Sequence, residues 1–79
     1  MPYIKQERRT EVLEGYATDP GELNFKLTTL IQDYHVFHGD SYRTFNDIIG
    51  ALEAAKLEFY RRIVVPYENK KVEQNGDVY

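Results

Sequence analysis

The sequence contains no cysteine and no tryptophan, and it has one serine and three prolines in 79 residues. Without cysteine, neither a disulfide nor a cysteine-based zinc site can support a small fold. The absence also fits a reducing compartment. A single domain of this length has roughly 3–5 kcal/mol available from its own core. Well-packed helices or self-association must therefore supply the remaining stability.

Long hydrophobic runs are also missing. The first nine residues are too polar for a signal peptide, and runs such as 63–65 are far too short to span a bilayer. We therefore expect a soluble, cytoplasmic protein without membrane association. The net charge of −3 and the pI near 5.3 argue against general nucleic-acid binding, which needs a basic field.

The clearest helix signal covers residues 20–38. Asp19 is a good N-cap, Pro20 occupies a position where its missing N–H costs nothing, and Glu22 would complete a capping box. Gly39 offers the residue type that commonly ends a helix. The apolar side chains recur at helical spacing, and they are Leu23, Leu27, Leu30, Ile31 and Tyr34.

A second, longer helix is predicted over 42–65, capped by Ser41 or Thr44. Its apolar stripe has a period of 3.6 residues and consists of Phe45, Ile48, Ile49, Leu52, Ala55, Phe59 and Ile63. Pro66 removes a backbone donor, so we expect a break or kink there. A short helical extension over 67–75 and a tail over 76–79 would follow.

Residues 6–16 carry enough apolar positions for a short first helix, preceded by an extended segment over 1–5. The chain is therefore expected to be all-α, a single domain over 1–79. A short loop between two long helices makes them antiparallel neighbours. The predicted architecture is a short helix, a long antiparallel helical hairpin and a kinked C-terminal extension.

The long helix also has a smaller second apolar face, formed by Gly50, Ala54 and Leu57. A glycine inside a helix costs about 1 kcal/mol relative to alanine, so a close neighbour would explain it. One interpretation places the first short helix against this face. The other makes it a homo-oligomer interface together with Phe25 and Phe37, which lie off the main stripe of their own helix. The two interpretations are compatible.

Evidence for enzymatic chemistry is weak. His35 and His38 could share a helix face and bind a metal, but no carboxylate lies at a ligand spacing from them, and histidines also suit a helix C-terminus. Glu53 and Glu58 have cations at helical spacing, which favours solvated ion pairs over an acid–base pair. We therefore expect no enzyme, no cofactor and no metal.

The last third of the chain holds half of the ten basic residues, with tyrosines among them. We call this set the basic–tyrosine cluster, and it consists of Lys56, Tyr60, Arg61, Arg62, Tyr67, Lys70 and Lys71. Cationic groups bind phosphate, and tyrosine rings stack on bases. The cluster is therefore either a solvated polar face or a site for a nucleotide-like anion.

Several segments together resemble a family of small uncharacterised bacterial and phage proteins with a domain-of-unknown-function label. They are Met1–Ile4, Gly21–Asn24, the run Asn46–Arg62 (NDIIGALEAAKLEFYRR), Pro66–Lys71 and Asn75–Tyr79 (NGDVY). The resemblance covers nearly the whole chain and provides no catalytic residues. It implies a free-standing protein, and a phage origin would place it in the host cytoplasm.

Three functions remain open from the sequence. The leading one is a homo-oligomeric binding protein that sequesters a nucleotide-like anion, such as a host defence signal, at the basic–tyrosine cluster. The alternative is an adaptor whose C-terminal extension binds a host or phage protein. The third is an enzyme built on His35, His38 and a glutamate.

Overall fold

The computed structural model describes residues 4–79, and its contacts divide the chain into two compact units, Met1–Phe45 and Asn46–Tyr79. Residues 1–3 of the expected extended segment lie outside the described residues. The described chain is helical without a strand, so the all-α class is confirmed. The antiparallel pairing of the two long helices stays a prediction.

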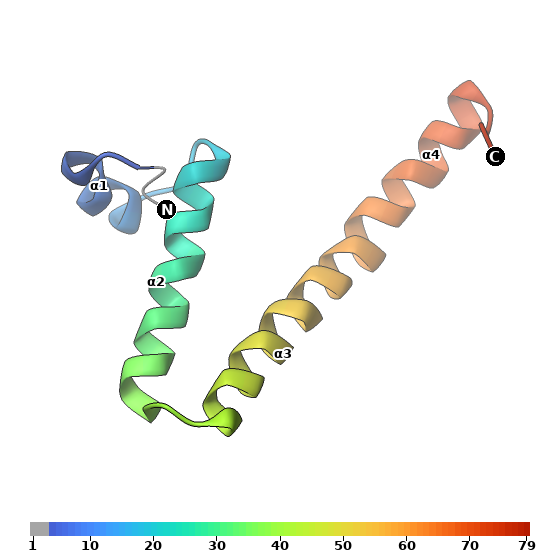
Figure 1. The fold of residues 1–79 in the computed structure, drawn as a ribbon. Helices are drawn as coiled ribbons and strands as arrows, with labels where there is room; N and C mark the ends of the chain where they lie inside the picture. The colour runs from blue at the N-terminus through green and yellow to red at the C-terminus, as the bar shows by residue number, and fades with distance from the viewer. Residues whose placement is uncertain (1–3) are drawn as a thin grey trace. The chain divides into compact units, whose positions relative to one another are not determined.

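The first unit begins with a 3₁₀ turn, η1 (Gln6–Arg8), which leads directly into α1 (Arg9–Glu14). The expected helix over 6–16 is thus shorter, because Gly15 ends α1 by donating its N–H to the Glu11 carbonyl at 3.0 Å. Helix α1 packs beside α2 (Pro20–His38), as Figure 1 shows.

Helix α2 has the bounds that its capping residues indicate. The Asp19 side chain accepts a hydrogen bond from the Glu22 N–H at 2.8 Å, and Pro20 occupies the first turn. At the other end Gly39 adopts φ +80°, in the region that favours glycine, and its N–H bonds to the His35 carbonyl at 2.7 Å.

The core of the first unit is small. Val12, at 1% exposure, and Ile4 are the buried apolar residues among residues 4–79. The leucines of the α2 stripe remain exposed, with Leu23 at 53% and Leu30 at 67%. Most of the apolar surface that the helical periodicity directs inward therefore has no cover within the first unit.

Helix α3 (Tyr42–Phe59) starts at Ser41, whose hydroxyl accepts from the Thr44 N–H at 3.1 Å. Of the two expected caps, Ser41 therefore takes the role. Beyond α3 come the π-helical turn η2 (Tyr60–Val64) and α4 (Val65–Asn75), without a gap in the helical backbone (Figure 1). Gly76, at φ +82°, ends α4 and leaves 76–79 as a non-helical tail.

The expected break at Pro66 is wrong, whereas a kink there stays a prediction. Val64 and Val65 both keep right-handed helical dihedral angles, and helix continues to Asn75. Proline lacks an N–H and its ring crowds the carbonyl four residues earlier, here that of Arg62. The backbone adjusts by widening the turn before the proline: the Val65 N–H bonds to the Tyr60 carbonyl, five residues back.

Candidate functional site

The basic–tyrosine cluster lies along the end of α3, through η2 and into α4, all within the second unit. Its two arginines already have a carboxylate partner. Arg61 and Arg62 both form ion pairs with Glu58, at helical spacings of three and four residues. The arginine side chains are each 72% exposed, so these pairs are solvated surface interactions.

Lys56 is paired in the same way, with its Nζ 3.4 Å from Glu53. The ordinary interpretation of Glu53 and Glu58 as ion-pair partners is therefore confirmed. Each of these three cations has a neighbouring carboxylate that lowers its net attraction for an added anion. The cluster is consequently less electropositive than its list of cations suggests.

The tyrosines of the cluster are accessible. Tyr60 is 52% exposed and Tyr67 is 60% exposed, and the Lys71 ammonium lies 5.5 Å from the centre of the Tyr67 ring. That separation is within the range of a cation–π contact. Tyr67 and Lys71 are thus the members of the cluster that the structure brings together without a carboxylate between them.

A shallow hollow at the end of α4 includes one member of the cluster, Lys71. Its lining consists of Glu68, Lys71, Val72, Asn75, Gly76, Asp77, Val78 and Tyr79. The carboxylates of Glu68 and Asp77 face the same space as the single lysine. An anion placed there would meet more negative than positive charge.

The residues expected at an oligomer interface are mostly exposed. Phe37 is 85% exposed and Leu57 is 54% exposed, while Phe25 is half-buried. A Cβ added at Gly50 would meet nothing within 4 Å, and Ala54 is exposed. These side chains are available to a partner, and their role in an interface stays a prediction.

The two histidines have separate neighbours. His35 Nε2 lies 2.5 Å from Asp40 Oδ1, a carboxylate contact that the sequence analysis did not anticipate. The turn after α2 brings Asp40 back, which helical spacing alone does not show. The His38 ring instead packs 4.1 Å from Tyr34 and 5.0 Å from Phe37, between centroids. Residues 4–79 contain no group of three or more His, Asp or Glu placed to hold a metal.

Glu22 is the buried charged residue that the sequence did not reveal. Its side chain is 8% exposed and accepts hydrogen bonds from the Thr18 N–H and hydroxyl, each at 2.9 Å, and from Arg8 Nε at 3.2 Å. Of the expected capping box, the bond from the Glu22 N–H to Asp19 is present, but the Glu22 side chain bonds to Thr18 rather than to the N–H of Asp19.

These bonds, led by the Thr18 backbone N–H, hold the pKa of Glu22 below its usual value although burial acts in the opposite direction. The same pairing raises the pKa of Arg8, which also binds Glu11. Arg8 thus connects the start of α1 to α2. In the sequence, Thr18 and Asp19 before the helix were the available signal for hydrogen bonds to Glu22. No sequence spacing indicates that Arg8 would also bind Glu22.

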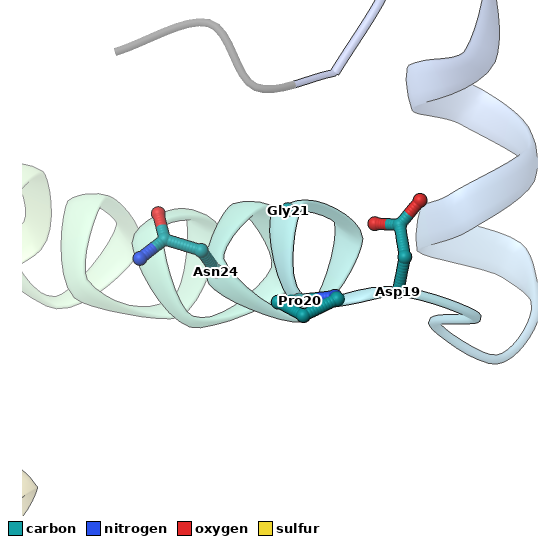
Figure 2. Close-up of a pocket in the computed structure, with 4 residues that line it drawn as sticks. All are labelled: Asp19, Pro20, Gly21 and Asn24. Atoms are coloured by element: carbon teal, nitrogen blue, oxygen red, sulfur yellow. The ribbon is translucent and has the colours of Figure 1, made fainter.

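Another hollow lies at the first turn of α2, lined by Asp19, Pro20, Gly21 and Asn24 (Figure 2). The Asp19 carboxylate is already used in capping the helix. We therefore assign no ligand to this hollow.

None of the helices formed by residues 4–79 combines the length and apolar character needed to cross a bilayer.

Comparison with known proteins identifies one family. A model described as "Domain of unknown function (DUF6899)" matches residues 1–78, and the chain belongs to that family. The comparisons with curated proteins and with solved structures gave no match. The expected membership of an uncharacterised family is thus confirmed, while a bacterial or phage origin stays a prediction.

Proposed function

We propose that this chain is a non-enzymatic, homo-oligomeric helical protein that acts by binding other polypeptides. The observation that carries the proposal is the exposure of large apolar side chains along α3, η2 and α4. Phe59 is 61% exposed, Ile63 is 57% exposed and Ile49 is 65% exposed. Side chains of this kind stabilise a small protein only when something covers them.

The lengths of the helices support the proposal that one copy does not provide enough cover. Helix α2 has 19 residues, whereas α3, η2 and α4 together have 34, from the 18, 5 and 11 residues of each. In the antiparallel hairpin that we propose, α2 reaches back along the partner helix only to about residue 60. About 15 residues of helix, roughly 22 Å, then extend beyond it.

A second copy of the same chain is the partner that this argument favours. A lone helix is marginal in water, because its stability comes mostly from packing an apolar face. A two-fold dimer is the commonest way in which soluble chains supply that cover. The C-terminal extension would contribute to this interface and could also engage a further protein, which is the adaptor role.

The direct test is the absolute mass in solution, measured by light scattering during gel filtration, together with helix content at decreasing concentration. We expect a mass at a multiple of 9.3 kDa and loss of helix on dilution. A chain that is monomeric and fully helical at all concentrations would refute the proposal. Deleting 75–79 then tests the adaptor role, since the oligomer should persist while a protein that binds the tail is lost.

Anion binding is the second candidate, favoured by the exposed Tyr67–Lys71 pair in α4. Thermal shift with mono-, di- and cyclic nucleotides tests it. A ligand at 100 times its Kd adds about 2.7 kcal/mol, which is easily visible as a rise in Tm. Tyr67→Ala or Lys71→Ala should abolish the shift, whereas deleting 75–79 should not. An unchanged Tm with every nucleotide at millimolar concentration would exclude this function.

A further inference from the structure

The segment before α2 depends on that helix, whereas α2 does not depend on the segment. We call residues 4–15 the lid segment, and it contains η1 and α1. Neither η1 nor α1 has a side-chain hydrogen bond at its N-terminus, and α1 has only six residues. Isolated helices shorter than about 12–15 residues are marginal in water. Helix α2 has 19 residues, and its first turn is capped by its own neighbours, Asp19 and Thr18.

Two polar contacts hold the lid segment, one near each end of α1. Before the helix, Arg8 Nε donates to Glu22 Oε2 at 3.2 Å. After it, the Gly15 carbonyl accepts a hydrogen bond from Lys26 Nζ. Glu22 and Lys26 are four residues apart, so they lie on one face of α2. Both contacts therefore fasten the lid segment to the same face.

The apolar contact between these two points is small. Val12, at 1% exposure, and Ile4, at 7%, are the buried apolar side chains of residues 4–79, while Leu13 of α1 is 48% exposed. On α2, Phe25 lies three residues after Glu22, on the face to which the lid segment is fastened, and it is half-buried. With so little apolar burial, the polar contacts provide a large share of the attachment.

The linker to α2 allows the lid segment to leave. Residues 16–18 have no regular secondary structure. Gly15 and Asp19, which flank them, both have extended backbone, with φ −124° and φ −146°. Thr18 bonds to Glu22 through its N–H and its hydroxyl, and both bonds lie on the α2 side of the linker. Release of the lid segment therefore leaves the first turn of α2 intact.

We propose that the lid segment opens from α2 as one unit while α2 stays helical, and that this opening controls access to Phe25. The inference concerns the first unit alone and goes beyond the proposed self-association. Phe25 is one of the side chains that the sequence predicts at an oligomer interface. Arg8 and Lys26 determine how much of the protein is closed.

Thiol labelling of Val12→Cys measures the opening. The variant has a single thiol, because the chain has no native cysteine, and position 12 is 1% exposed. The reagent can therefore reach the thiol only when the lid segment opens. Below the urea concentrations that reduce helix content, we expect a labelling rate that hardly depends on urea, because local opening exposes little surface. A rate that follows the urea dependence of helix loss would overturn the inference.

Two substitutions in this labelled variant test the polar contacts. Arg8→Ala should raise the labelling rate about tenfold, because it removes a charged hydrogen bond to a buried carboxylate. Lys26→Ala should also raise the rate, since it removes the contact at the other end. Arg43→Ala removes an equal charge from α3 and should leave the rate unchanged. Acceleration by neither Arg8→Ala nor Lys26→Ala would contradict the proposal.

Hydrogen exchange of the full chain without a cysteine separates opening as a unit from fraying of the ends. The Arg9 N–H bonds to the Gln6 carbonyl, and the Gly15 N–H bonds to the Glu11 carbonyl at 3.0 Å, so the two amides report on both ends of α1. Arg8→Ala should accelerate both equally and leave the amides in the middle of α2 unchanged. Acceleration of the Arg9 amide alone, or equal acceleration throughout α2, would refute opening as a separate unit.

Discussion

Replacing Phe59 with alanine tests which face of the long helix forms the interface. Phe59 is 61% exposed, and the proposed interface would cover the exposed part of its ring. Full burial of such a side chain contributes about 1.5–3 kcal/mol, and the uncovered part corresponds to about 1–2 kcal/mol per copy. A symmetric dimer loses this contribution twice, so Phe59→Ala should raise the dimer Kd about 30- to 700-fold.

The assay is sedimentation equilibrium across a concentration series, with Phe37→Ala as the matched control. Phe37→Ala removes the same side-chain volume at a residue that is 85% exposed, but Phe37 lies in α2, outside the apolar surface of α3, η2 and α4. We expect the control to dimerise like the unmodified chain. If Phe37→Ala dissociates the dimer while Phe59→Ala leaves it intact, the apolar surface of α3, η2 and α4 is not the interface, and the interface first expected around Phe37 gains support.

Three further predictions concern single residues. Because the pKa of Glu22 is lowered in the folded chain, its stabilising effect is complete above its ordinary value of 4.5 and is lost as the pH falls through the folded pKa. Melting temperatures from pH 7 to pH 3 should therefore fall in acid, and Glu22→Gln should flatten that profile; an unchanged slope contradicts this. Val12→Ala should destabilise the first unit by about 2 kcal/mol, measured by urea unfolding, since Val12 is 1% exposed. Gly50→Ala meets open space and should stabilise helix by about 1 kcal/mol, unless Gly50 contacts a partner, in which case the oligomer weakens in light scattering.

The ends of α2 could be predicted because local hydrogen bonds determine them. Asp19 accepts from a backbone N–H three residues later, and Gly39 supplies the positive φ that closes the last turn. Neither interaction depends on what packs against the helix. The capping residues at each end were therefore sufficient to predict where α2 begins and ends.

The interactions of Glu22 and the continuity at Pro66 could not be predicted in the same way. Several hydrogen-bond donors compete for the Glu22 carboxylate. Which of them it binds depends on Arg8, 14 residues away, which comes within reach once α1 has packed. The rule that proline cannot donate a backbone hydrogen bond holds at Pro66, but it does not determine how the helix backbone accommodates the loss. A wider turn over 60–64 satisfies the Tyr60 carbonyl and allows helix to continue.

The composition of the basic–tyrosine cluster is visible in the sequence, and so is the carboxylate that neutralises part of its charge. Glu58 lies three residues before Arg61 and four before Arg62, which are the spacings at which helical side chains meet. That count alone indicates that one carboxylate serves two guanidinium groups. A phosphate would have to compete with a carboxylate already in place, whereas a partner helix can use the pairs as they stand. The balance of charge along 46–75 therefore favours a polypeptide partner over a free anion.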